Sequence, residues 1–442
     1  MTTADTTRTQ QALYQRAKLL IPGGTQLLSK RPEMFAPGQW PTYYREARGC
    51  EVIDIEGRKW LDMSIMGIGS CLLGYNDPDV TAAVTRCIQN GSMCTLNAPQ
   101  EVELAERLLG MHPWAQQVRY ARGGGEAMAL AVRLARAATA RTIVAFCGYH
   151  GWHDWYLAAN LADADHLDGH LLPGLSPLGT PRQLVDTALP FAYNRLDQLE
   201  ALVHRHGDRL AAVVMEPTRT LDPAPGFLEG VRALCDRSGA VLIFDEITSG
   251  FRLHFGGAHL KYGVMPDVAV YSKALSNGHP MAAVIGVQGV LEAAARSFIS
   301  STYWTEAVGP TAALATIEKM SSLDLPSHVQ HIGTKLRQGL TAAAARHSLP
   351  LKLAGHAAIT SIAFDHPKNA ALGTLFTVRM LEQGILAGSS FYACLAHQDE
   401  HVARYLEAAE PVYAELAAAI AADDIESRIG GPVRSSGFSR LT

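Results

Sequence analysis

Val241-Leu-Ile-Phe-Asp245-Glu246 is a run of four apolar residues that ends in two acids. A second apolar run, Asp267-Val-Ala-Val-Tyr-Ser-Lys273, ends in a lysine. Such runs are typical of buried strands, and open α/β sheets bind their ligands at the carboxyl ends of the strands. Taken alone, each charged residue could be a solvated group after a strand. However, the 28 positions between Asp245 and Lys273 match a strand–crossover–strand unit, which would deliver both side chains to one cleft.

The same alternation of apolar runs and amphipathic stretches extends over about residues 100–290 and predicts a layered α/β sheet. The strands predicted in it are Val118–Ala121, Thr142–Cys147, Ala211–Glu216, Val241–Asp245, Asp267–Tyr271 and Ala282–Val287. Helices are predicted at Ala127–Ala138 and Leu228–Ser238, and the second pattern stops at Gly239.

The two ends of the chain have a different pattern. Helices are predicted at Leu291–Ser297, Gly309–Met320, Ser327–Arg346 and Asp399–Ala422, a strand at Thr360–Phe364 and a hairpin at Glu51–Met63. We therefore expect a large domain at 65–300, with a mostly parallel sheet flanked by helices. A smaller α+β domain would combine 1–64 with 301–442.

Composition excludes several classes of protein. Hydrophobic residues make up 48% and charged residues 18%, which is typical of a globular chain. The net charge of −4, with no basic stripe, argues against nucleic-acid binding. Seven cysteines without a Cys-x-x-Cys pair favour free thiols in a reducing compartment. No apolar run is long enough to span a bilayer, and the polar start MTTADTTRTQQ lacks a signal core. We expect a cytoplasmic protein.

An acid and a lysine in one cleft suit a particular chemistry. A cofactor with a pyridine nitrogen needs a carboxylate to keep that nitrogen protonated, so that the ring can accept carbanion electrons. It also needs a partly desolvated lysine amine to form an imine, and the same lysine can later move a proton between carbon atoms. The pairing of Asp245 with Lys273 therefore indicates pyridoxal phosphate.

Two further stretches fit such a cofactor. Val118-Arg-Tyr-Ala-Arg-Gly123-Gly124-Gly125-Glu126 reads as strand, glycine turn and helix start, where backbone amides can bind a phosphate, although glycine also serves ordinary turns. Phe146-Cys-Gly-Tyr149-His150-Gly151-Trp152-His153 follows another strand, and an aromatic side chain there could lie on a flat ring. The alternatives are core aromatics that seal a loop, or a metal bound by His150 and His153. No third metal ligand is evident nearby, so we predict no metal site.

These residues together resemble the class III aminotransferases of the type I pyridoxal-phosphate fold, and most closely their glutamate-1-semialdehyde 2,1-aminomutase branch. The resemblance runs from about Leu19 to about Glu400. It rests on ordered motifs at 21–24 (IPGG), 73–78 (LGYNDP), 123–127 (GGGEA), 148–151 (GYHG), 193–194 (YN), 216–217 (EP), 244–252 (FDEITSGFR), 272–273 (SK) and 380–384 (MLEQG).

The resemblance implies a role for each matching residue. Lys273 would hold the cofactor as a Schiff base, Asp245 would pair with the ring nitrogen, and Ile247 and Tyr149 would cover the two ring faces. The remaining cofactor contacts implied are the amides of Gly124 and Gly125, which would bind the phosphate, Glu216, and Thr305, which would reach the phosphate of the partner subunit. The active sites of a homodimer would then be shared.

The departures from the family concern the substrate. Gly125 stands where the family has a threonine, so a hydroxyl donor is lost. The aminomutase arginine falls at Lys30, its tryptophan near Ile68, and its glutamate near Ser389. Leu221 stands where ω-amino-acid aminotransferases have a glutamate. The residues we assign to the substrate are Lys30, Ile68, His150 and Arg219.

We therefore predict an aminotransferase that moves an amino group from an amino donor to a carbonyl acceptor through Lys273. The rebuilt substrate site favours an acceptor such as a keto sugar or cyclitol in biosynthesis. The alternatives are an aminomutase of the glutamate-1-semialdehyde type, a racemase or decarboxylase on the same scaffold, and a binding protein without catalysis. Retention of Lys273, Asp245 and Tyr149 argues against the last of these.

Overall fold

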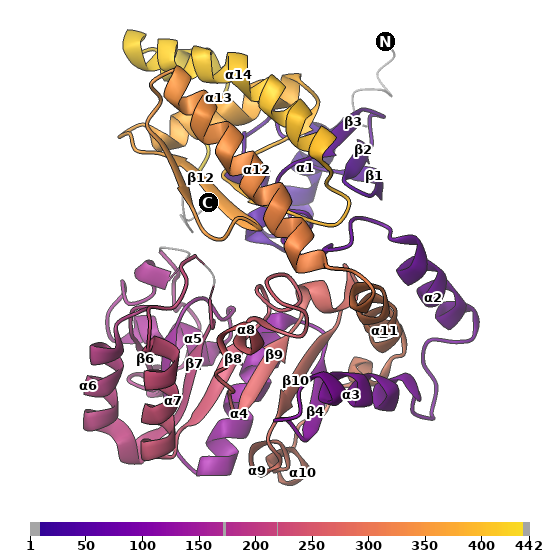
Figure 1. Cartoon of the computed structure of the whole chain (residues 1–442), viewed down its shortest axis with the longest axis vertical. Helices are drawn as coiled ribbons and strands as arrows, with labels where there is room; N and C mark the ends of the chain where they lie inside the picture. Colours follow the sequence, from indigo (N-terminus) through magenta and orange to yellow (C-terminus); the bar gives the residue numbers. More distant parts are fainter. Residues whose placement is uncertain (1–8, 171–173, 219, 436–442) are drawn as a thin grey trace. The chain divides into compact units, whose positions relative to one another are not determined.

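A computed structural model gives the fold (Figure 1) and describes residues 9–170, 174–218 and 220–435. The chain divides into two compact units. The large unit is Pro78–Pro326, and the small unit combines Met1–Asp77 with Ser327–Thr442. Within the described ranges, no helix combines the length and the apolar character needed to cross a bilayer.

The large unit is built around a seven-stranded sheet in the order β4-β10-β9-β8-β7-β5-β6. Its strands are β4 Gln117–Ala121, β5 Ile143–Cys147, β6 Ala188–Pro190, β7 Leu210–Met215, β8 Val241–Asp245, β9 Val268–Tyr271 and β10 Ala282–Gly286. Only β10 pairs antiparallel with its neighbours β4 and β9, and the other four pairings are parallel. The predicted α/β class and the mostly parallel sheet are confirmed.

Helices cover both faces of this sheet because its strand residues alternate between two apolar cores. On one face, residues such as Phe146 and Ile243 pack in a cluster with helix α4, Gly124–Thr139. On the other face, Phe244 and its neighbours pack with α7, Phe227–Ser238, and with Leu199 of α6, Leu196–His206. Figure 1 shows α6 and α7 side by side on this face.

The boundaries of the large unit differ from those predicted, because of how three helices pack. Helix α11, Val308–Ser321, packs against α2, Pro78–Gln89, and against α3, Gln100–Met111. The sequence placed the domain boundaries after residues 64 and 300, whereas the units divide after Asp77 and Pro326. The shift arises because α11 packs against helices of the large unit. The single helix predicted at Leu291–Ser297 is two short helices, α9 Gln288–Leu291 and α10 Ala293–Arg296.

Among the described residues, the small unit contains two sheets and five α-helices. One sheet, in the order β1-β2-β3-β13, consists of β1 Tyr44–Arg48, β2 Glu51–Asp54, β3 Lys59–Asp62 and β13 Ile385–Leu386. The other consists of β11 Leu351–Ala354, β12 Ile359–Phe364 and β14 Ser390–Tyr392. The helices are α1 Gln10–Leu20, α12 Leu325–Arg346, α13 Asn369–Glu382, α14 Asp399–Ala422 and α15 Ile425–Ile429. The hairpin predicted at Glu51–Met63 is formed by β2 and β3.

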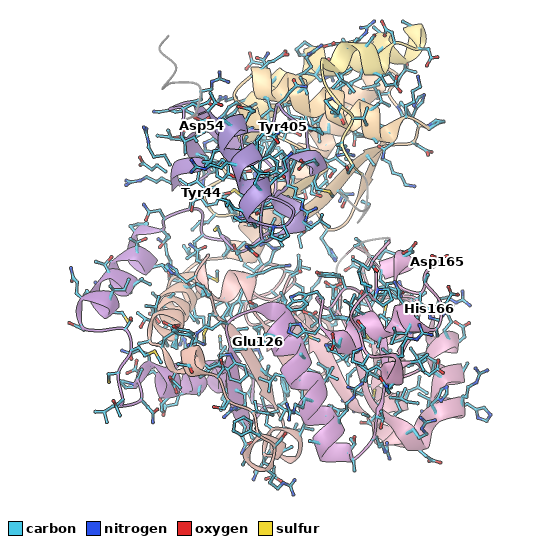
Figure 2. The ribbon with its side chains drawn as sticks, turned by 180° about the vertical axis from the view of Figure 1, so that it is seen from behind. Tyr44, Asp54, Glu126, Asp165, His166 and Tyr405 are labelled. Carbon is cyan, nitrogen blue, oxygen red and sulfur yellow. The ribbon has the colours of Figure 1, made fainter. Side chains whose placement is uncertain are left out.

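Asp54 ties the N-terminal segment to this hairpin (Figure 2). Its carboxylate is buried and accepts hydrogen bonds from the side chains of Gln10 (2.8 Å) and Trp60 (2.9 Å). It also accepts the backbone N–H groups of Glu56 and Arg58, each at 2.9 Å. Four donors therefore converge on one carboxylate.

We predict that Asp54→Asn lowers the free energy of unfolding by about 2–3 kcal/mol, because an amide has one acceptor oxygen and cannot accept from all four donors. Chemical denaturation followed by circular dichroism measures the loss. The exposed Asp208 provides the control, and its substitution by Asn should change stability by less than about 0.5 kcal/mol. Equal stability of the two variants would contradict the role assigned to Asp54.

Candidate active site

The acid and the lysine singled out in the sequence lie at neighbouring strand ends. Asp245 is the last residue of β8, and Lys273 follows β9 after Ser272. The two strands pair in parallel, with Asp245 opposite Val270. Both side chains therefore start from the same carboxyl edge of the sheet, where open α/β folds bind ligands.

Asp245 is held by a buried histidine. Its Oδ2 lies 2.8 Å from Nδ1 of His150, and its Oδ1 accepts the backbone N–H of Ile247 at 3.0 Å. Nε2 of His150 lies 3.1 Å from the carbonyl oxygen of Cys147. Both ring nitrogens thus face oxygen atoms, and these two contacts fix the orientation of the ring. The sequence analysis assigned His150 to the substrate, and in the structure its side chain is fully buried and lies against Asp245.

Glu246 has a separate histidine partner. Its Oε1 lies 2.8 Å from Nδ1 of His259, and the hydroxyl of Ser249 donates to Oε2 at 2.5 Å. Burial raises the pKa of Glu246, but the hydrogen bonds from His259 and Ser249 outweigh burial and leave this pKa below its usual value. The turn after β8, which carries Ile247 and Thr248, is therefore fixed at its base.

Lys273 makes a contact that the sequence did not predict. Its Nζ donates a hydrogen bond to Oγ1 of the buried Thr248 at 2.8 Å. Its backbone is in the left-handed region, with φ of +46°, which is uncommon for a residue with a side chain. Such strain is often found at functional sites, where the surrounding structure maintains it.

The glycine loop ends where α4 begins. The carboxylate of Glu126, in the first turn of α4 (Figure 2), accepts the backbone N–H groups of Arg122 (2.9 Å) and Gly123 (3.4 Å). The next two amides, those of Gly124 and Gly125, belong to the first turn, where helix geometry provides no intrahelical acceptor. They lie at the positive end of the helix dipole, which is suited to a phosphate.

The glycines also allow close packing around the cofactor position. A Cβ atom on Gly124 would lie 2.9 Å from Cδ1 of Ile247, and one on Gly151 would lie 2.9 Å from Cα of Gly125. The phosphate loop is therefore next to Ile247, the residue expected beneath the ring. The segments that carry the phosphate donors and the ring-packing side chain are adjacent, and the acid and the lysine follow the neighbouring strands β8 and β9. This arrangement fits a phosphorylated pyridine.

Tyr149 follows β5 and is half-buried against the core. Its ring packs edge-on against Tyr156, with 5.9 Å between the ring centroids. The hydroxyl of Tyr156 donates to the carbonyl of Gly148 at 3.0 Å, which fixes the backbone just before Tyr149.

Within the described ranges, no group of three metal-ligating side chains is found.

Glu216, which was expected to contact the cofactor, follows β7 and lines a cavity of about 280 Å³. The other lining residues are Cys147, Gly148, Gly169, His170, Tyr193, Thr220 and Leu221. Nδ1 of His170 accepts the N–H of Gly148 at 3.2 Å, and burial, with a contribution from His150, lowers the pKa of His170 to about 4. The cavity is therefore bordered by a carboxylate and a neutral histidine.

Thr305 lies in a short exposed turn, Thr302–Thr305, and its hydroxyl donates to the carbonyl of Thr302 at 3.1 Å. The turn is anchored to the glycine loop of its own chain. Nε1 of Trp304 donates to Glu126 at 3.0 Å, and Arg122 forms an ion pair with Glu306 at 2.8 Å. These contacts hold the turn that carries the exposed Thr305 against the glycine loop.

The structure shows no contact among the other residues assigned to the substrate within the described ranges. Lys30 is exposed at the end of a short turn in the small unit. Ile68, also in the small unit, has φ of +61° and stands in a run of four left-handed residues, Met66–Gly69. Arg219 lies outside the described residues. The roles of these three residues stay predictions.

A family profile, "Aminotransferase class-III", matches residues 34–411. The chain belongs to this family. The predicted enzyme class, aminotransferase, and its cofactor, pyridoxal phosphate, are confirmed by this membership. The matched region of this chain includes Asp245, Lys273 and the glycine loop.

Curated relatives of this class III aminotransferase have more than one activity. It is 32% identical to a glutamate-1-semialdehyde 2,1-aminomutase of Syntrophobacter fumaroxidans, over 90% of this chain and 95% of the relative. It is 29% identical to a 3-aminobutyryl-CoA aminotransferase of Cloacimonas acidaminovorans, over 92% and 96%. These relatives agree on the family and disagree on the substrate.

Solved structures agree on the fold. The FumI protein of a Sphingopyxis species, in its PLP internal aldimine form, superposes with a TM-score of 0.83 at 26% identity, covering 93% of this chain and 97% of that one. An omega-transaminase from Sphaerobacter thermophilus gives 0.80 at 26% identity, covering 93% and 98%. The type I fold predicted for this class III aminotransferase is confirmed.

Thr248 provides a test of the geometry around Lys273. We predict that Thr248→Val, which keeps the shape and removes the hydroxyl, slows proton transfer about tenfold, because a misplaced base transfers a proton poorly. Thr248→Ser retains the hydroxyl and should stay within about threefold of the unaltered enzyme. Stopped-flow absorbance with α-deuterated donor measures this step, and an equal rate in the valine and serine variants would argue against the contact.

Proposed function

We propose that this class III aminotransferase transfers an amino group between two separate molecules, an amino donor and a carbonyl acceptor. The observation that supports this most directly is the convergence of Asp245, backed by His150, and Lys273, held by Thr248, on one sheet edge. When bound, pyridoxal phosphate supplies a ring that accepts the electrons left when a proton leaves the amino-bearing carbon.

The residues of the chain would divide the remaining work. Asp245 would keep the ring nitrogen protonated, and its contact with His150 orients the acid. Lys273 binds the cofactor and then serves as the base that moves the proton. Ile247 and Tyr149 would hold the ring, and the amides of Gly124 and Gly125 would bind the phosphate.

Transfer between two molecules is preferred to the aminomutase reaction because the substrate contacts of the aminomutase branch are absent. Lys30 and Ile68 replace its arginine and tryptophan. Leu221 replaces the glutamate of the ω-amino-acid enzymes and lines the cavity beside Glu216. This cavity, with its carboxylate and neutral histidine, suits a hydroxylated acceptor such as a keto sugar or cyclitol in a biosynthetic pathway. Seven cysteines without a disulfide among the described residues support a cytoplasmic location.

Spectroscopy separates the two reactions. We expect an effective donor to convert the purified yellow protein to its colourless aminated form and to release a keto product in equal amount, which chromatography quantifies. Isomerisation of one substrate with no keto product would show an aminomutase. Borohydride treatment before donor addition should fix the cofactor to Lys273, and Lys261, an exposed lysine of the same unit, is the residue to check for nonspecific labelling.

We also propose a homodimer in which Thr305 completes the phosphate site of the partner subunit. The exposed position of Thr305, in a turn bonded to the glycine loop, supports this arrangement. Two exposed apolar side chains nearby in the sequence also support it, Phe298 (86% exposed) and Tyr303 (70%). Such side chains favour burial at an interface.

Hybrid dimers test the shared site. Lys273→Ala and Thr305→Glu proteins, each inactive alone, should regain activity when they are dissociated and reassembled together. Each hybrid then has one site with an intact lysine and an intact threonine, so about a quarter of normal activity is expected in a random mixture. The control is reassembly of each variant alone. Demonstrated hybrids without activity would place Thr305 in the site of its own chain.

A further inference from the structure

A buried nitrogen of His153 has no partner among the described residues. His153 precedes the short helix α5, Asp154–Leu157, in the loop after β5. Its Nδ1 is buried and makes no hydrogen bond with the described residues. Its ring stacks on Trp152, with 4.5 Å between centroids. Because buried polar atoms are nearly always paired, an orphaned one next to a candidate site calls for a ligand.

His153 lies beside Gly125 of the glycine loop. A Cβ atom on Gly125 would lie 3.2 Å from Nδ1 and 3.3 Å from Cε1 of His153. The imidazole therefore fills the space that a side chain at position 125 would occupy. Gly151, with φ of +102°, lets the His153 loop approach the first turn of α4 this closely.

The chemistry of the loop fits an additional donor. Gly123, Gly124 and Gly125 provide backbone amides but no hydroxyl, and Glu126 already accepts from Arg122 and Gly123. A phosphate at the amides of Gly124 and Gly125 would thus lack a side-chain donor from this loop. We propose that His153 is a ligand of the cofactor phosphate and donates its Nδ1–H in place of that hydroxyl. This inference rests on the proposed function, because the phosphate is that of pyridoxal phosphate.

The protonation of the ring is compatible with this role. Burial lowers the pKa of His153, against the opposing carboxylates of Glu126 and Asp154. A neutral imidazole has one N–H donor, and an approaching phosphate selects the tautomer that carries it on Nδ1. No proton has to be taken up from solvent when the phosphate binds.

Binding of two cofactor forms to the apoprotein tests this contact. His153→Ala should weaken binding of pyridoxal phosphate about tenfold or more, as expected for one lost hydrogen bond to a charged group. Binding of pyridoxal, which has no phosphate, should stay unchanged. Fluorescence titration measures both, and the exposed His204→Ala is the control. Equal weakening for the two compounds would show a structural role only, and no weakening would exclude the contact.

A second variant restores the donor by another route. Gly125→Ser in the His153→Ala background should recover most of the lost affinity for pyridoxal phosphate, because the space beside position 125 is then open. The same serine with His153 in place should weaken binding, since its Cβ would lie only 3.2 Å from the ring. Absence of recovery in a folded double variant would overturn the replacement argument. If the unaltered apoprotein bound neither compound, the proposed function itself would fail.

Discussion

The parallel pairing of β8 with β9 is the constraint on which the active site depends. Parallel neighbours end at the same edge, so the acid and the lysine meet there although 28 positions separate them in the sequence. The turn after β8 then places Ile247 against the glycine loop and Thr248 against Lys273. A slip of one residue in this pairing would turn Asp245 to the opposite face of the sheet.

Two adjacent acids, Asp245 and Glu246, have different histidine partners. Successive residues of a strand point to opposite faces, and Asp245 and Glu246 each find a different histidine, His150 and His259. A buried carboxylate is costly without a partner, and each of these two has a ring nitrogen 2.8 Å away. One pair can serve the cofactor while the other fixes the turn, because the two pairs do not share a partner.

Much of the fold could be predicted from the sequence because its signals are local. The central strands are uninterrupted apolar runs, and Val241–Asp245 and Asp399–Ala422 have the predicted bounds. Strand β6 was missed because three residues are too few to show a pattern. Helix α13 was missed because ten of its fourteen residues are buried, which leaves no polar face to reveal its period.

The site was predictable only in part for a related reason. Asp245, Lys273 and the glycine loop are recognisable from the residues that surround them in the sequence. The contact of His150 with Asp245 joins residues 95 positions apart, and that of Lys273 with Thr248 depends on side-chain conformation. Neither leaves a local pattern. His153 was noticed as a potential metal ligand, whereas its relation to Gly125 follows only from the packing of two loops.

The pairing of β13 with β3 has a consequence for protein synthesis. It joins Leu61 to Ile385, so the sheet of the small unit cannot be completed until nearly the whole chain has left the ribosome. The large unit, in contrast, is one continuous segment that ends at Pro326. Domains generally fold as units during translation. The large unit can therefore fold before residues 327–442, which complete the small unit, have been synthesised. During that interval Leu61, which is buried in the complete small unit, stays accessible to chaperones.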